Sequence, residues 1–195
     1  MKNSARVAER RARGFTLVEL LVVIAIIAIL AAVVVLIINP LELTRRGRDA
    51  ARLTDLANLQ NAINVTVQEA TGSGTASILC KPTGSYPCGG SAGQGQSNVG
   101  TRLADGTGWV KADLAAQTSV SVPTLPVDPV NNPTYHYTYC ADNDSWEINT
   151  VLESEQQKGK MANDGGNENA TDTTGRYEVG SKLTIIAATG GSCTY

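Results

Sequence analysis

The stretch that decides the fold begins Arg13-Gly14-Phe15-Thr16-Leu17-Val18-Glu19 and continues as LLVVIAIIAILAAVVVLII at residues 20–38. The second part holds 19 consecutive residues drawn only from Leu, Val, Ile and Ala. At about 1.5 Å per helical residue it extends roughly 28 Å, close to the ~30 Å hydrocarbon thickness of a bilayer. It lacks the polar face of a soluble core helix and exceeds the roughly 7–15 apolar residues of a secretory signal. We therefore predict a membrane-spanning helix.

Charge is divided by this span. Residues 1–14 carry five basic residues against Glu9, a net charge of +4, and the whole chain is −2, so the remainder carries −2 − 4 = −6. Because basic residues mark the cytoplasmic side of a span, we expect residues 1–14 in the cytoplasm and the head outside. Arginines at 45, 46, 48 and 52 lie on the far side and run against this rule. The head has no basic stripe with interleaved aromatic residues, so nucleic-acid binding has little electrostatic support.

A second helical pattern follows the span. Asn39-Pro40 either starts a new helix, with Asn39 as its N-cap, or kinks one continuous helix. Apolar residues then recur at three- and four-residue steps from Leu53 to Val67, which predicts an amphipathic helix that ends near residue 70. Gly47 is a position where this helix could bend. A helix over residues 15–70 would extend roughly 84 Å, so we expect it to protrude from so small a head and pack against other copies.

The remaining residues predict a small antiparallel sheet. Residues 71–124 are rich in Gly, Ser, Thr and Pro and predict irregular structure, with a flexible loop at 89–100. Tyr135, Tyr137 and Tyr139 alternate with polar residues, as on a half-buried strand. Two further strands are expected around residues 146–152 and within 176–187. The predicted fold class is α+β.

Four cysteines lie in the head, at positions 80, 88, 140 and 193. An even number in an extracytoplasmic head favours disulfides over a metal site, and the chain has no C-x-x-C motif and only one histidine, His136. Sequence does not choose among the three possible pairings. We favour Cys80–Cys88, which would close a short loop, with Cys140–Cys193, which would tie the tail to the sheet.

The N-terminal pattern resembles the leader of the type IV pilin and type II secretion pseudopilin superfamily. The shared features are a basic leader, Gly14, Phe15-Thr16-Leu17, Glu19 and an apolar span. The resemblance implies that a prepilin peptidase cleaves between Gly14 and Phe15 and that Phe15 is then N-methylated. It also implies that Glu19 orders assembly by pairing with the α-amino group of a neighbouring subunit. Such a role fits the physics, because a buried carboxylate is tolerated only when it is paired.

The resemblance also implies a pilin-like architecture in four parts. These are a cleaved cytoplasmic leader at 1–14, a transmembrane and filament-core segment at 15–38, its amphipathic continuation at 39–70 and an extracytoplasmic head at 71–195. We expect a single-pass protein of the inner membrane that later enters an extracytoplasmic filament. The implied partners are other copies of the chain, minor pilins, the prepilin peptidase, the inner-membrane assembly platform and, before assembly, membrane lipid.

The proline-rich stretch narrows the resemblance to major type II pseudopilins. In that family Asp-Pro and Asn-Pro or Asn-Asp pairs precede an aromatic strand, and here Asp128-Pro129 and Asn132-Pro133 precede Tyr135. The chain departs from the pattern at Val130, where the family usually has Trp, and in the short insertion at 80–88. We predict a pseudopilus subunit. The alternatives are a type IV pilus or DNA-uptake pilin, for which nucleic acid would be a partner, and a membrane-anchored binding module. No catalytic constellation is present, so we expect no enzyme.

An oxygen-rich loop lies near the C-terminus. It runs from Asn163 to Glu168 and continues to Asp172, and its carboxylates and amides are oxygen ligands of the kind that calcium prefers. The spacing is not that of an EF-hand. Major pseudopilins carry a calcium site in their C-terminal loops, so the resemblance raises the prospect of calcium at Asp164 and Asp172. The alternative is a solvated turn.

Overall fold

The computed structural model describes residues 14–70, 75–91, 93–115, 119 and 122–195, and every structural statement below concerns these residues. The chain divides into two compact units, Met1–Pro40 and Leu41–Tyr195. Of the expected leader, only Gly14 lies among the described residues. The second unit begins at residue 41, so the segment at 41–70 belongs with the head.

The first unit contains α1, which spans Leu17–Ile38. One described helix, at Leu17–Val35, is long and apolar enough to cross a membrane. Asn39 ends α1 with a φ of 45°, a left-handed conformation that Asn tolerates. Pro40 then begins α2, which continues to Glu69. The sequence therefore forms two helices, with Asn39 as the C-cap of the first, and Gly47 does not interrupt the second.

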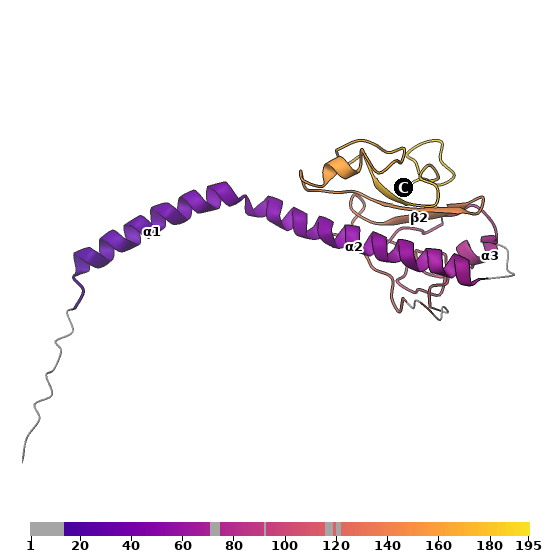
Figure 1. The fold of residues 1–195 in the computed structure, drawn as a ribbon, viewed down its shortest axis with the longest axis horizontal. Helices are drawn as coiled ribbons and strands as arrows, with labels where there is room; N and C mark the ends of the chain where they lie inside the picture. The colour runs from indigo at the N-terminus through magenta and orange to yellow at the C-terminus, as the bar shows by residue number, and fades with distance from the viewer. Residues whose placement is uncertain (1–13, 71–74, 92, 116–118, 120–121) are drawn as a thin grey trace, which may run out of the picture. The chain divides into compact units, whose positions relative to one another are not determined.

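Helix α2 packs its apolar face against its own head. Leu56, Leu59 and Ile63 are fully or almost fully buried, which confirms the predicted amphipathic face. Figure 1 shows α2 running along one side of the sheet. The head of the same chain covers this face. Other copies are therefore not needed to bury it, although the length of the helix had suggested packing between copies.

The head contains a four-stranded antiparallel sheet in the order β1-β2-β3-β4. The strands are β1 (Cys88–Gly89), β2 (Thr138–Asp142), β3 (Ser145–Thr150) and β4 (Tyr177–Gly180). Asn143 and Asp144 have φ values of 46° and 62° and close the β2–β3 hairpin with the positive-φ geometry that two-residue hairpin loops use. The three expected strands are present, and β2 begins three residues after Tyr135.

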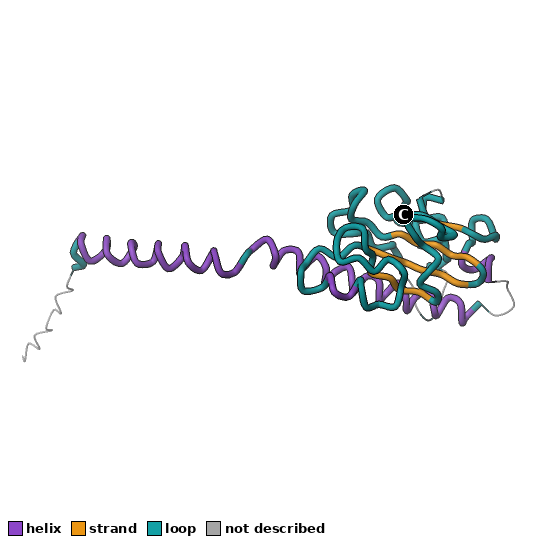
Figure 2. Tube along the Cα trace, turned by 90° about the horizontal axis from the view of Figure 1, so that it is seen from above, coloured by secondary structure: helices purple, strands orange, loops and turns teal. Residues whose placement is uncertain are grey.

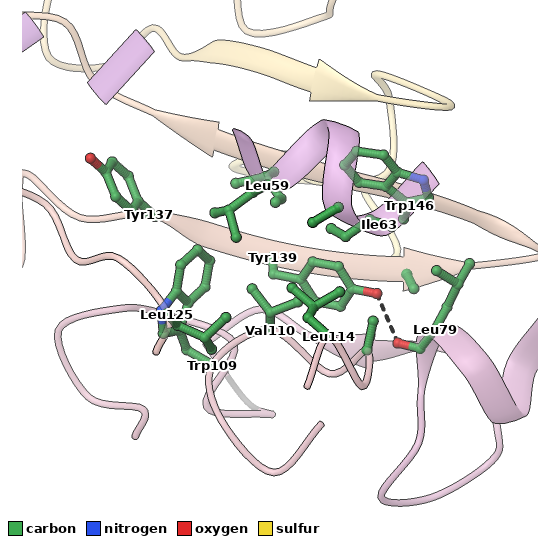
Figure 3. Close-up of a cluster of buried hydrophobic side chains, with 14 of the residues drawn as sticks. Leu59, Ile63, Leu79, Trp109, Val110, Leu114, Leu125, Tyr137, Tyr139 and Trp146 are labelled. Atoms are coloured by element: carbon green, nitrogen blue, oxygen red, sulfur yellow. Dashed lines mark hydrogen bonds between the residues drawn. The ribbon is translucent and has the colours of Figure 1, made fainter. Parts of the chain in front are cut away.

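The sheet is buried on both faces. One face carries Tyr137 and Tyr139 into a core with Leu59, Trp109 and other apolar residues (Figure 3). The Tyr139 hydroxyl donates to the Leu79 carbonyl at 2.8 Å. The other face carries Thr138 and Cys140, which are also buried. The half-buried strand was therefore a wrong prediction, because C-terminal segments cover the second face (Figures 1 and 2).

The segment between α2 and β2 is mostly irregular, as predicted, apart from α3 (Thr75–Leu79) and β1. The loop at 89–100 is not the flexible loop that its glycines suggested. The Gly90 N–H donates to the Tyr139 carbonyl, and the Tyr139 N–H donates to Gly95, both at 2.8 Å. A Cβ on Gly95 would lie 2.5 Å from the Tyr139 carbonyl oxygen. Glycine is needed here because the loop lies directly against the sheet backbone.

Candidate functional site

The start of α1 is organised by Thr16 and Glu19. Thr16 is the N-cap, and its hydroxyl accepts a hydrogen bond from the Glu19 N–H at 3.2 Å. The Glu19 carboxylate accepts from the Thr16 N–H at 2.9 Å and from the Thr16 hydroxyl at 2.8 Å. This reciprocal arrangement is a capping box, which satisfies backbone donors at the end of a helix. The glutamate of the motif therefore has local partners in the single chain.

The backbone just before this cap is accessible. Thr16 is in an extended conformation, and Phe15 is 83% exposed. A Cβ placed on Gly14 would meet no atom within 4 Å. The Gly14–Phe15 peptide bond therefore lies in an open, non-helical segment, as cleavage by a peptidase requires.

Two disulfides fasten the head. Cys80 is bonded to Cys88, and Cys140 is bonded to Cys193. This is the pairing that the sequence analysis favoured. The second bond joins the C-terminal tail to β2, and the adjacent Ile186 and Cys193 form a parallel bridge. The described cysteines include no free thiol.

A buried ion-pair network, which sequence reasoning missed, joins α2 to the head. Arg52 is fully buried and donates to both carboxylate oxygens of Asp128, at 2.6 and 2.9 Å. Its remaining terminal nitrogen lies 2.8 Å from Asp49 and 2.6 Å from Glu153. Burial alone would lower the pKa of Arg52, but its hydrogen bonds and attraction to these three carboxylates outweigh burial and raise that pKa.

Arg48 completes the network through a bidentate pair with Glu153, at 2.9 and 2.5 Å. Burial acts to raise the pKa of Glu153, and the two arginines outweigh it, so the net shift is downward. Helical spacing could have indicated that Arg52 is buried, because it lies four residues before Leu56 and seven before Leu59 and so shares their buried face. Its partners in the proline-rich loop and after β3 are distant in sequence, and no local pattern points to them.

Two buried carboxyl groups meet on the second face of the sheet. Glu147 on β3 and Glu178 on β4 lie diagonally across the strand pair and are 0% and 2% exposed. Glu147 accepts from the N–H groups of Ile185 and Ile186, and Glu178 accepts from the Glu168 N–H. Burial and the hydrogen bond to Glu147 raise the pKa of Glu178 to about 9. The pair therefore holds a proton at neutral pH and fastens C-terminal segments to the sheet.

The residues considered for calcium serve local turns. Asp164 accepts from the N–H groups of Gly166 and Glu178, at 3.0 and 2.8 Å. Asp172 accepts from the N–H and hydroxyl of Thr174, at 2.8 and 2.6 Å. Within the described part of the chain, no group of three or more His, Cys, Asp or Glu is arranged to hold a metal. Both aspartates thus have local partners, and calcium binding stays a prediction.

Comparison with known proteins places the N-terminal segment in a family. Residues 10–35 match the prokaryotic N-terminal methylation motif, which is the signature of type IV pilins and pseudopilins. No curated protein and no solved structure matches the chain. The chain thus carries the N-terminal signature of type IV pilins and pseudopilins. It joins this signature to a pilin-like α+β arrangement of one long N-terminal apolar helix and a small antiparallel sheet. Proteins of this class are structural, and they are processed by a prepilin peptidase and assemble into filaments.

Proposed function

We propose that this protein is a structural subunit of a type II secretion pseudopilus. The observation that carries the proposal is the methylation motif at residues 10–35, which includes the start and most of the 22-residue apolar helix α1. The proline-rich loop favours the pseudopilus within this class, because Asp128-Pro129 and Asn132-Pro133 ahead of an aromatic strand resemble the pattern of major type II pseudopilins. A membrane-anchored binding module would need only the apolar helix as its anchor. That function gives no reason for the methylation motif.

The N-terminal geometry supports a two-stage use of Glu19. In the precursor the carboxylate is held by Thr16 of the same chain. Cleavage after Gly14 creates a positively charged α-amino group on Phe15, and N-methylation leaves a secondary amine that still carries this charge. In the filament the amino group of one copy pairs with Glu19 of another, which neutralises a carboxylate among apolar helices. The all-apolar surface of α1 is first covered by lipid and then by equivalent helices.

The membrane stage has a proposed direction and proposed partners. The basic leader remains in the cytoplasm and the head lies outside, where the two disulfides form. Prepilin peptidase, an inner-membrane assembly platform and minor pilins act on the subunit in turn. Protease added to intact spheroplasts is expected to digest the head and to leave the leader protected.

Mass spectrometry of the mature N-terminus tests the class-defining step. An N-methylated Phe15 is expected in cells that express the prepilin peptidase, and an intact Met1 in those cells would contradict the proposal. The Glu19→Ala variant is expected to be cleaved normally and to yield few filaments. Glu155→Ala, which removes an exposed head carboxylate, is its matched control. A normal filament yield from Glu19→Ala would remove the assembly role of Glu19.

A type IV pilus or DNA-uptake pilin is the second candidate. The Cys140–Cys193 bond favours it, because a disulfide that closes a C-terminal loop suits a pilin. Deletion of the chain separates the two candidates. A pseudopilus subunit is required for export of secreted proteins, whereas a pilin is required for surface pili or for uptake of DNA.

A further inference from the structure

The four arginines that follow the span divide into two pairs in the structure. Arg48 and Arg52 are held within the head by Glu153 and Asp128. Arg45 and Arg46 stay at the surface, with 38% and 46% of their side-chain areas exposed. Carboxylates of the head therefore neutralise Arg48 and Arg52, whereas Arg45 and Arg46 remain at the surface.

The charge around the exposed pair is unbalanced. Arg45 and Arg46 both lie near one carboxylate, that of Glu42, at 3.9 and 3.4 Å. Glu42 is itself 12% exposed and also accepts a hydrogen bond from the Glu155 N–H at 3.0 Å. The Glu155 carboxylate pairs with Lys158 at 2.8 Å and also interacts electrostatically with Arg45. The two carboxylates of Glu42 and Glu155 thus face three cations, Arg45, Arg46 and Lys158, so this turn keeps a net positive charge.

Exposed leucines accompany these arginines at the start of α2. Leu41 is 57% exposed and Leu43 is 51% exposed, although each is a large apolar side chain. Leucines together with arginines on one exposed helical segment are typical of helices that lie at a membrane interface. Arginine suits this position because its apolar stem can lie along the interface while the guanidinium reaches a phosphate.

The length of α1 places this segment at the headgroups. Its 22 residues extend about 33 Å, which covers the ~30 Å hydrocarbon layer by Ile38. From Pro40 to Arg46 the helix rises at most about 9 Å along the membrane normal, and less if it is tilted. The headgroup layer is roughly 5–7 Å thick on each side, so long side chains from this turn reach the phosphates at any tilt.

We propose that Arg45 and Arg46 bind the phosphates of anionic phospholipids in the leaflet on the head side, while Leu41 and Leu43 lie against the interface. This inference rests on the proposed membrane stage of the subunit. The contact sets how deeply the span lies in the bilayer, and it must be broken when a subunit is extracted into a filament.

The test uses the full chain reconstituted into nanodiscs of phosphatidylcholine and phosphatidylglycerol, with native mass spectrometry of the lipids that stay bound. The wild type is expected to retain phosphatidylglycerol in excess of its share in the bilayer. In Arg45→Gln/Arg46→Gln this excess is expected to fall by about fivefold for each arginine, as a basic residue at an anionic surface predicts. Lys160→Gln/Lys182→Gln is the matched control, since it removes two exposed charges elsewhere on the head. The basic leader contributes equally to all three proteins.

An unchanged phosphatidylglycerol excess in the arginine variant would overturn the proposal, as would an equal loss in the control. If the excess is unchanged and filament yield falls, the arginines bind acidic groups of another copy instead of lipid. Two further properties are measured in parallel: whether the chain stays in the membrane after carbonate extraction, and whether it is cleaved after Gly14. Release by carbonate or absence of cleavage would count against the proposed function, independently of the lipid result.

Discussion

Replacing Arg52 by methionine tests whether the buried network holds α2 to the head. The substitution removes a fully buried cation that contacts Asp49, Asp128 and Glu153, and it retains most of the side-chain volume. Breaking a buried ion pair by removing one partner typically costs about 3–5 kcal/mol, because an uncompensated charge stays buried.

The structure places the expected loss at the lower end of that range. Asp128 keeps hydrogen bonds from the Val130 and Asn131 N–H groups, and Glu153 keeps Arg48. Asp49 keeps the N–H groups of Glu153 and Ser154. We therefore expect a loss of about 3 kcal/mol, which is roughly a 150-fold change in the unfolding equilibrium constant.

Urea unfolding of the full chain in detergent micelles measures this loss. Trp109 and Trp146 are 0% and 2% exposed, so their fluorescence reports on the head. Arg46→Met is the matched control, because Arg46 is largely exposed and its pair with Glu42 is worth less than about 1 kcal/mol. A loss below about 1 kcal/mol for Arg52→Met, or a loss equal to that of the control, would refute the reasoning.

Three further predictions concern the head. Because the pKa of Glu178 is raised in the folded state, its stabilising contribution is complete below about pH 4.5 and is lost as pH rises toward 9. The free energy of unfolding should therefore fall by up to about 3 kcal/mol between pH 6 and 8, and Glu178→Gln should make this fall smaller. An equal slope in both proteins would contradict a shared proton. The Cys140–Cys193 bond closes a loop of 53 residues and the Cys80–Cys88 bond a loop of 8. Replacing Cys140 and Cys193 by serine should therefore lower the free energy of unfolding in urea by about 1.7 kcal/mol more than replacing Cys80 and Cys88. Calcium at Asp164 and Asp172 should make EDTA lower the melting temperature, and an unchanged melting temperature would exclude a stabilising calcium site.

Local sequence patterns were sufficient wherever a single segment carries the information. The apolar run at 20–38 predicted α1 by its length, and the order of Gly14, Phe15 and Glu19 matched a family motif without any tertiary contact. Periodicity placed Leu56 and Ile63 on one buried face of α2. These features follow from spacing along one chain segment, and spacing is fully contained in the sequence.

Contacts between distant segments were decided by the tertiary structure. The sequence grouped Arg52 with three other arginines beyond the span, and its burial depends on Asp128 and Glu153, 76 and 101 residues further along. The loop at 89–100 was expected to be flexible, yet Gly95 packs on β2. Glycine permits both behaviours, and only the neighbouring strand selects between them.

An apolar N-terminal helix and a methylation motif that overlaps it could be predicted from sequence alone, because both properties depend only on consecutive residues. The tertiary structure decided which charges are structural and which remain at the surface. A charged side chain is stable in the interior only where opposite charges converge on it. Folding brings Asp128 and Glu153 to Arg52 and leaves Arg45 and Arg46 facing outward, a distinction that four arginines in one short stretch of sequence do not reveal.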